Sequence, residues 1–590
     1  MAINKLKDLP AQQRRVIRAW CMYDWANSGY ATAGGAAIFP VYFVFLFKDA
    51  LGESVSFMGI TFTGSSTWSL GIAFATALVA LSSPVLGVIA DRVAIKKALL
   101  WIYTIVGSLF TVLMFFSAYA GQPWLYFLAM FIIANIGFAG CLVFYNTFLP
   151  HIAPRELLDD VSSRGFAYGY VGGGLLLAVH LAMILLTRDT QWADLVTRIA
   201  MSSIGLWWFG WALWTFRLVP EPHIPDAMHG LRPGRAISLA FRELGHTFRQ
   251  MRGFRVIVIY LASYLLFNDG VQTVLTVAGA YGADTIGIPL VFNMATILLI
   301  QFVAAFGAMA FSWLAYRLTT KVALALTLVG WSFVVLLGVG VAPLEPHDHG
   351  DFDYQLRYEA TAGSYLVEKA PQLEDSRLDR AWAAEIGHIT AMTPDGALRK
   401  GESLAADNSM DGENAGRLLE AVNTAPDAPY SISLAGGPLD GTRAVGSLHP
   451  SVLGEGPIDW WPALLRDRVW KPLGLLVGYQ WLLLGVGVGL VMGGSQALAR
   501  SLFAQIVPHT RSGEFFSFFG FMGRVSSVIG PIVYVVVTGV LDTRMAVLSI
   551  LILIIAGGIL LKWVDVGAGA RAADEEDARH YAESGVAATE

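Results

Sequence analysis

Two polar stretches interrupt long apolar segments of this chain, and each contains a carboxylate. Tyr23-Asp24-Trp25-Ala26-Asn27-Ser28 lies near the N-terminus, and Asn268-Asp269-Gly270-Val271-Gln272-Thr273 lies far downstream. Both fit D-x-x-[N/Q]-[S/T], and in a helix the residues three and four after the acid share its face. A carboxylate inside a membrane span costs about 2.5 kcal/mol or more, so such groups are rare and usually functional. The two stretches therefore predict a duplicated polar site, one in each half of the chain, although five loosely matched positions also arise by chance.

The second acid, Asp269, is a candidate for exchanging a proton or binding a cation. Asp269 follows about three helical turns of apolar residues, which places it near mid-membrane. Arg524 lies about ten residues into another apolar segment and needs a buried carboxylate partner, for which Asp269 is the candidate. We expect Asp269 either to exchange a proton, or to trade Arg524 for a substrate ammonium, or to be a structural partner only. Neutral hydrogen bonds around it would come from Tyr264, Asn268 and Gln272.

The first acid lies nearer the membrane surface, because Arg18 precedes it by six residues. We expect Asp24 to line one half of a solute path together with Tyr23 and Asn27. Such groups suit a small polar solute, and a zwitterion in particular. Arg500 lies near the end of its own apolar segment, where a long side chain can reach the interface. The alternative to a side chain that extends to the membrane surface is that Arg500 forms part of the site.

The composition explains which elements must position these residues. Of 590 residues, 55% are hydrophobic and only 14% are charged, and the mean hydropathy is +0.56. This excludes an ordinary soluble enzyme and indicates a membrane protein. Twelve segments are long and apolar enough to cross a bilayer. They lie at about 20–46, 68–90, 98–119, 124–149, 164–187, 198–219, 255–281, 288–315, 321–343, 472–499, 515–540 and 544–564.

These spans predict an all-α membrane protein of two six-helix, pseudo-symmetric halves. The sequence separation between Asp24 and Asp269 differs from that between Pro150 and Pro508 by about the length of one polar insertion. We therefore expect an N-terminal half, a cytoplasmic linker, helices seven to nine, a small α/β or irregular insertion, helices ten to twelve, and a disordered acidic tail. Their boundaries are 1–219, 220–253, 254–343, 344–470, 471–565 and 566–590.

Charge sets the expected orientation. Short basic loops fall on one side of a twelve-span arrangement, which predicts cytoplasmic termini in the cell membrane and an extracytoplasmic insertion. The stretch His347-Asp348-His349-Gly350-Asp351 could offer metal ligands, but an acidic linker is the simpler interpretation, because nothing fixes the remaining ligands. We expect no metal, no cofactor and no nucleic acid, and a monomer in the bilayer.

Several motifs resemble a known family. Gly87-x-x-x-Asp91-Arg92-x-x-x-Lys96-Lys97 resembles the loop signature of the major facilitator superfamily, although Ala94 and Ile95 stand where glycine and arginine are usual. The two acidic stretches resemble the family of the autophagy-related vacuolar amino-acid effluxer and its bacterial relatives. The other motifs carrying this resemblance are Tyr145-Asn146-Thr147-Phe148-Leu149-Pro150, Gly165-Phe166-Ala167-Tyr168-Gly169-Tyr170, Gly493-Gly494-Ser495-Gln496-Ala497, Arg500-Ser501-Leu502-Phe503 and Glu514-Phe515-Phe516.

The resemblance implies a major facilitator fold and amino-acid export in the fungal branch, and it leaves the substrate of the bacterial branch undefined. It also implies that Asp91 and Arg92 form a gating latch between helices two and eleven, near Ser512 and Gly513. A plain solvated turn is the alternative. The chain is therefore expected to be a secondary transporter of a small polar solute, with protons as the candidate coupling ion. The alternative is a membrane-anchored receptor or enzyme whose insertion acts, but 344–470 contains no G-x-S-x-G, P-loop or paired C-x-x-C motif.

Overall fold

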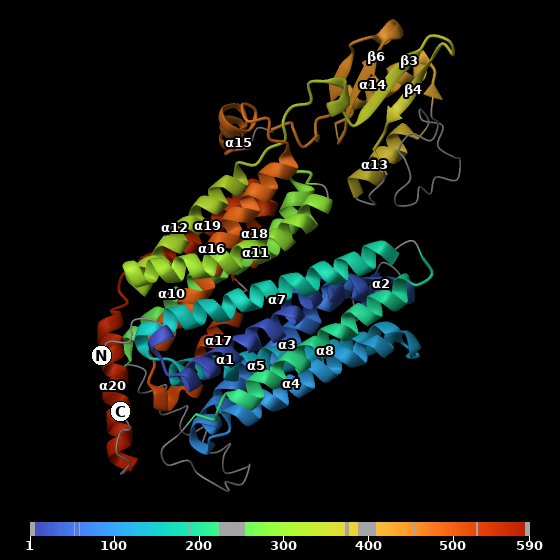
Figure 1. Ribbon diagram of the computed structural model, residues 1–590. Coiled ribbons are helices and arrows are strands. Elements are labelled where there is room, and N and C mark those ends of the chain that lie inside the picture. The colour runs from blue at the N-terminus through green and yellow to red at the C-terminus, as the bar shows by residue number, and fades with distance from the viewer. Residues whose placement is uncertain are drawn as a thin grey trace.

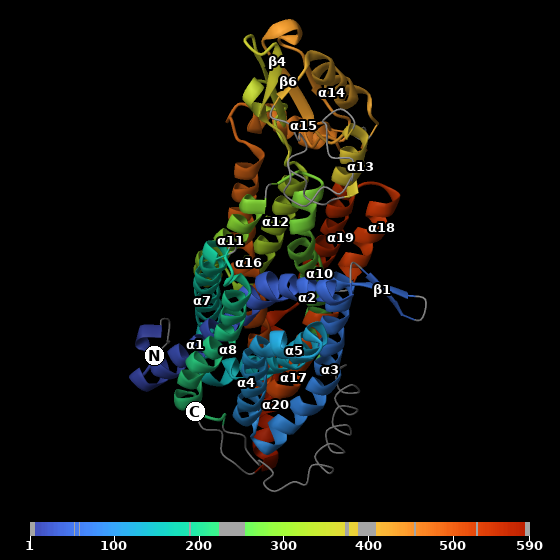
Figure 2. The same ribbon diagram turned by 90° about the vertical axis from the view of Figure 1, so that its right-hand side faces the viewer.

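The protein consists of two bundles of long helices and a small sheet domain (Figure 1). The computed structural model describes residues 6–51, 54–57, 60–187, 190–222, 254–288, 290–371, 377–387, 409–426, 428–453, 456–526 and 529–584. All but the first three residues of the linker expected at 220–253 lie outside these residues. The sheet domain caps one end of the C-terminal bundle, and helix α20 lies at the opposite end with both chain termini (Figures 1 and 2). These are called the insertion end and the termini end below.

The N-terminal half contains six long helical segments. Its first segment is α1 (Ala11–Gly29), which continues through a π-helical stretch, Tyr30–Ile38, into α2 (Phe39–Leu51). A hairpin of β1 (Ser54–Phe57) and β2 (Ile60–Thr63) follows. The other helices are α3 (Gly64–Val93), α4 (Lys96–Leu113), α5 (Pro123–Thr147), the short α6 (Leu149–Ile152), α7 (Leu158–Thr187) and α8 (Ala193–Leu218).

The C-terminal half repeats the arrangement, but its fifth segment consists of two helices. Predicted helix eleven is α17 (Ser512–Val525) followed by α18 (Ile529–Val540). The polar insertion interrupts this half between α12 and α16. The remaining helices are α10 (Arg255–Asp284), α11 (Leu290–Arg317), α12 (Thr320–Val339), α16 (Val477–Ile506) and α19 (Thr543–Leu561).

Ten stretches of the described residues are long and apolar enough to cross a membrane. The predicted second and sixth spans, α3 and α8, are helical but are not among these ten. In α8 the reason is composition, because it holds four tryptophans, which contribute little hydropathy but favour membrane interfaces. Lipid-facing surfaces are rich in exposed apolar side chains, among them Phe306, Phe333 and Ile552. The chain is therefore a multi-pass membrane protein.

The insertion folds around a core of its own. Its five-stranded sheet has the order β5-β4-β3-β6-β7, in which β3 and β6 are parallel and the other pairs are antiparallel. Helix α14 packs on this sheet, and Tyr354, Trp382 and Ile432 are among the buried residues. The elements are β3 (Tyr354–Glu359), β4 (Ser364–Lys369), α13 (Arg377–Ile386), β5 (Ser409–Met410), α14 (Gly412–Thr424), β6 (Ser431–Ala435) and β7 (Arg443–Val445), with α15 (Trp460–Leu465) leading back to the bundle.

The described part of the acidic tail, which ends at Ser584, is helical and not disordered as the sequence predicted. Residues Val566–Ser584 form α20, which lies against the termini end of the bundle (Figure 1). The Asp577 carboxylate accepts bonds from the backbone N–H groups of His509 and Thr510, at 2.8 and 3.0 Å. Asp574 pairs with Arg155 at 2.6 Å. The helix is held because its acids find partners in loops of both halves.

Candidate functional site

A cavity of about 580 Å³ lies between the two halves. Thr32 and Tyr170 contribute from the N-terminal half, whereas α10, α11, α12, α16 and α19 of the other half form most of its wall. Because α1 and α10 run from the termini end, the lining residues Thr32 and Gln272 lie beyond Asp24 and Asp269, toward the insertion end. The described lining contains no charged side chain. Its polar groups are Thr32, Tyr170, Gln272, Thr276, Tyr281, Asn293, Thr296, Gln301 and Gln496 among aliphatic residues and Trp481.

A hydrogen bond between the halves closes the cavity toward the termini end. The Tyr170 hydroxyl on α7 donates to Oε1 of Gln496 on α16, at 2.6 Å. Both residues line the cavity. Four residues later on α16 comes Arg500, about 6 Å further along the helix axis. The cavity floor and Arg500 therefore follow one another along the same contact surface between the two halves, which is called the seam below.

Beneath this floor, Asp24 and Arg500 form an ion pair between the halves. Nη1 of Arg500 lies 3.3 Å from Oδ2 of Asp24, and the two residues are only 4% and 6% exposed. The Tyr145 hydroxyl donates to the same carboxylate oxygen at 2.8 Å. Arg500 also donates through Nε to Oγ of Ser162, at 2.9 Å, and through Nη2 to its carbonyl, at 2.7 Å. Arg500 thus does not reach for the interface as the sequence predicted, but is buried in an acceptor site of the N-terminal half.

A glycine makes room for this pair. A Cβ atom on Gly165 of α7 would lie 2.5 Å from Oδ2 of Asp24 and 2.9 Å from Nη2 of Arg500. Four residues later, a Cβ atom on Gly169 would lie 2.5 Å from Oγ of Ser28. The backbones of α1 and α7 can approach closely only because these positions lack side chains.

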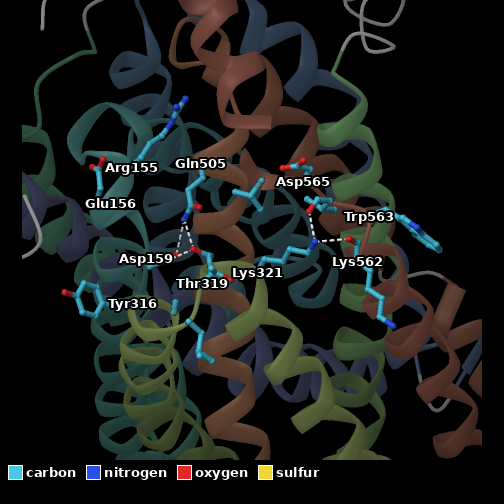
Figure 3. Close-up of a pocket in the computed structure, with 15 residues that line it drawn as sticks. Arg155, Glu156, Asp159, Tyr316, Thr319, Lys321, Gln505, Lys562, Trp563 and Asp565 are labelled. Carbon is cyan, nitrogen blue, oxygen red and sulfur yellow. Dashed lines mark hydrogen bonds between the residues drawn. The ribbon is translucent and has the colours of Figure 1, made fainter. Parts of the chain in front are cut away.

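Further contacts seal the termini end. The Asp159 carboxylate on α7 accepts bonds from Ser501, Gln505 and Thr320 of the C-terminal half. A surface groove of about 800 Å³ adjoins this cluster, where Figure 3 shows Asp159 beside Gln505 and Thr319. In the same view Lys321 donates to the carbonyls of Lys562 and Val564, both at 2.8 Å. The groove opens at the surface, whereas the 580 Å³ cavity lies between the halves and is the better solute site.

The predicted latch region also lies at this seam. Nζ of Lys96 donates to Oγ of Ser512 at 2.9 Å, and a Cβ atom on Gly87 would lie 2.6 Å from the Gly513 carbonyl oxygen. The C-terminal part of α3 therefore packs directly on the first turn of α17. The side chains of Asp91 and Arg92 lie outside the described residues, so the latch remains a prediction.

The second acid has partners that the sequence did not predict. Asp269 is fully buried, and its Oδ1 accepts the Gly530 N–H at 3.0 Å, at the start of α18. No described residue donates a hydrogen bond to its other oxygen, Oδ2. Next to it, Nδ2 of Asn268 donates to Oγ of Ser526 at 2.5 Å. The two side chains hold the region where α17 ends and α18 begins, and the positive N-terminus of α18 attracts the carboxylate.

The predicted Asp269–Arg524 ion pair is absent from this conformation. Nη2 of Arg524 donates instead to the Ala139 carbonyl of α5, at 2.5 Å, and Nη1 has no hydrogen-bond partner in the described part of the chain. The pairing assumed one continuous helix eleven. Because α17 ends at Val525, Arg524 belongs to its last turn and reaches into the N-terminal half, while Asp269 faces the start of the next helix.

The other predicted site residues fall into separate places. The Tyr23 hydroxyl bonds Oγ1 of Thr104 at 2.5 Å, and its ring stacks on Tyr145 at 4.9 Å. Asn27 is 3% exposed, and its Nδ2 has no partner. The Tyr264 ring stacks on Phe519 with centroids 4.3 Å apart. Of the predicted substrate residues, only Gln272 lines the cavity.

Sequence reasoning missed the groups that surround Asp24. Tyr145 was recognised only as part of a family motif, a site role of Arg500 was only the alternative, and Ser162 was not considered. The sequence did contain a sign of this contact, because Arg500 is a cation inside an apolar segment and needs a buried acceptor. Among the described residues, no cluster of three or more His, Cys, Asp or Glu side chains could hold a metal ion.

Comparison with known proteins identifies the family. The sequence profile described as "Vacuole effluxer Atg22 like" matches residues 12–345 and 460–574. The chain belongs to this family. The match covers both helical halves and leaves out most of the insertion, so the seam just described lies within the family's own part of the chain.

Two relatives and one solved structure support this assignment. The uncharacterized MFS-type transporter YxiO of Bacillus subtilis is 30% identical over 318 residues, covering 54% of this chain and 71% of YxiO. Autophagy-related protein 22-1 of Aspergillus niger is 29% identical over 163 residues, 27% of this chain and 25% of that protein. The proton:xylose symporter XylE superposes with a TM-score of 0.53 at 10% identity, covering 94% and 96% of the two chains, which concerns the fold alone. The Atg22-like protein is thus a transporter of the major facilitator superfamily.

Proposed function

We propose that this transporter moves a small polar solute of no net charge, an amino acid or a similar zwitterion, across the cell membrane by alternating access. The observation that carries the proposal is the 580 Å³ cavity between the halves, closed toward the termini end by Tyr170–Gln496 and then by Asp24–Arg500. Its volume falls within the range of about 300–1,000 Å³ that is usual for small-molecule sites. The basic loops and the bacterial relative favour a cell membrane and cytoplasmic termini.

The chemistry of the wall supports the solute class. An uncharged lining would leave a net charge on the solute uncompensated, which is costly in a low dielectric. Val274, Leu275, Ile297, Ile300 and Val488 can pack on an apolar side chain. Gln272, Asn293 and Gln496 offer both donors and acceptors, as a polar headgroup requires.

The transport experiment uses the purified chain in proteoliposomes. Vesicles loaded with one unlabelled amino acid are diluted into a trace of the same labelled compound, and counterflow is recorded across the standard amino acids. We expect counterflow for neutral amino acids with apolar side chains, and at least a tenfold loss in Gln496→Ala, because that change removes the floor contact with Tyr170. Absence of counterflow for every amino acid would show that the proposed solute class is wrong.

We also propose that Asp269 is the proton-coupling residue. A buried carboxylate with one oxygen that receives no hydrogen bond from the described residues is well suited to carry a proton there. Its partner Gly530, and Ser526, the partner of the adjacent Asn268, lie on either side of the point where helix eleven is broken. Asp269→Asn should abolish accumulation driven by a pH gradient while leaving exchange of solute measurable. Accumulation by Asp269→Asn against a gradient, with pH as the sole driving force, would assign Asp269 a structural role.

A further inference from the structure

Arg500 reaches from α16 of the C-terminal half into the other half. Among the described residues, the hydrogen-bond partners of its guanidinium all belong to the N-terminal half: Asp24 on α1, Asn146 on α5 and Ser162 on α7. Aromatic rings of the same half surround it, with the guanidinium carbon 4.9 Å from the centroid of Trp20 and 4.1 Å from that of Phe166. Arg500 is thus a cation of one half bound in a site built by the other.

This arrangement has a consequence for alternating access. Opening the termini end moves the halves apart and must withdraw Arg500 from its site. Asp24 then loses its cation, and the guanidinium loses its acceptors. Breaking a buried ion pair by removing one partner is strongly unfavourable, because an uncompensated charge is left behind. The step requires something that compensates a negative charge on one half and a positive charge on the other.

We infer that the Asp24–Arg500 pair is the recognition site for the two charges of a zwitterionic solute, which replaces the pair as the termini end opens. The solute carboxylate binds the guanidinium of Arg500, and its ammonium binds the carboxylate of Asp24. This inference rests on the proposed function. It goes further, because it makes both charges of the solute a condition for transport and not only for binding.

The geometry favours exchange at one edge of the guanidinium. Nε and Nη2 hold Ser162 at 2.9 and 2.7 Å, whereas Nη1 contacts Asp24 and Asn146 at the longer distances of 3.3 and 3.4 Å. The Nη1 edge is therefore the weaker side of the site. Gln496 on the cavity floor lies about one helical turn, or 6 Å along the axis of α16, from Arg500. A carboxylate can then take the guanidinium with two parallel hydrogen bonds.

The inference predicts how incomplete solutes behave. A compound with only an ammonium can satisfy Asp24 but leaves Arg500 without an anion, and a compound with only a carboxylate does the reverse. Either compound brings one uncompensated charge into the uncharged cavity, and neither compensates both halves. Such compounds should therefore be carried far more slowly than the zwitterion.

The experiment measures exchange in proteoliposomes with L-leucine and two analogues that each lack one charge. L-Leucinamide lacks the carboxylate, and 4-methylpentanoate lacks the ammonium. Labelled analogues should exchange at least tenfold more slowly than labelled leucine. Exchange of both analogues within threefold of leucine overturns the inference and leaves the proposed function intact. If no amino acid exchanges, the proposed function fails and the inference fails with it.

Two variants test the role of each residue through ratios of rates, which do not depend on how much protein is folded. In Asp24→Asn no carboxylate is left unpaired, so the rate for 4-methylpentanoate relative to leucine should rise at least tenfold. In Arg500→Gln the rate for leucinamide relative to leucine should rise in the same way. Either result suffices if the other variant fails to fold, and unchanged ratios in the folded variants overturn the inference.

A matched control separates recognition from the general loss of a buried arginine and its ion pair. Arg198 is 7% exposed and binds Asp194 at 2.8 Å, but both residues belong to α8, within one half. Arg198→Gln should lower thermal stability and leave both ratios within twofold of wild type. A tenfold rise in either ratio in this control would mean that discrimination does not reside in the Asp24–Arg500 pair.

Discussion

Helix α20 offers a direct test of the energetics at the termini end, through the substitution Asp577→Ala. The half-buried Asp577 carboxylate accepts hydrogen bonds from the backbone N–H groups of His509 and Thr510 and from the Thr510 hydroxyl, at 2.8, 3.0 and 2.5 Å. Removing it leaves two backbone donors without their acceptor, at the start of the loop that leads into α17. The substitution should release α20 from the bundle without touching the cavity.

The magnitude follows from these three bonds. A hydrogen bond to a charged group contributes about 1.5–3 kcal/mol. The sum over the three bonds is lowered because the carboxylate is partly exposed and because water can replace it as an acceptor in the variant. A net loss of about 2–4 kcal/mol in docking free energy is therefore expected. At about 1.36 kcal/mol per tenfold, the undocked population should rise about 30- to 1,000-fold.

Amide hydrogen exchange followed by mass spectrometry measures this population in peptides that cover α20. Asp574→Asn removes a bridge to Arg155 in which Asp574 is 65% exposed, so its effect should stay within about fivefold. Glu575→Gln alters a neighbouring exposed acid and should change nothing measurable. If Asp577→Ala exchanges no faster than Glu575→Gln, the carboxylate does not hold α20 and the assignment of its contacts is incorrect.

Three further predictions test other parts of the molecule. Gly165→Ala should destabilise the protein by about 1–3 kcal/mol, because its Cβ atom would meet Asp24 and Arg500, whereas Gly210→Ala meets nothing within 4 Å and should be neutral in thermal unfolding. Ser364→Cys should react with an impermeant maleimide on intact cells; labelling only after permeabilisation would refute an extracytoplasmic insertion. Burial alone would raise the pKa of Asp353, but bonds from His449 and Ser431 hold it below its usual range. The stability that the Asp353 carboxylate contributes to the insertion should therefore be complete above about pH 4 and lost as the pH falls further. The rate of proteolysis of the insertion measures this loss, and in Asp353→Asn its dependence on acid pH should weaken.

The sequence predicted best what depends on local pattern. Apolar runs of sufficient length placed α4, α5, α10 and α19 to within a few residues, because crossing a bilayer demands length and apolarity from each segment by itself. The Atg22-like family was also predicted, since its motifs are short and continuous in the chain.

Contacts between distant segments could not be predicted in the same way. Asp24 and Arg500 are 476 positions apart, and only the packing of α1, α7 and α16 brings them together. Arg524 was assigned to Asp269 because nothing in the apolar run showed that one helix would end at Val525 and another begin at Ile529. The acids of α20 have the composition of a disordered tail, and their partners lie in loops far away in sequence.

The two acids that looked like equivalent halves of a duplicated site differ in what surrounds them. Asp24 is bound by a residue of the opposite half, so its ion pair must change when the halves move relative to each other. Asp269 is bound by Gly530, a residue of its own half, and that contact can persist through the same movement. A solute that replaces Arg500 therefore acts directly on the seam. A proton at Asp269 can influence the seam through the break between α17 and α18, because α17 carries Arg524, which reaches Ala139 across it. Proton coupling at Asp269 by this route requires helix eleven to shift, whereas solute recognition at Asp24 does not.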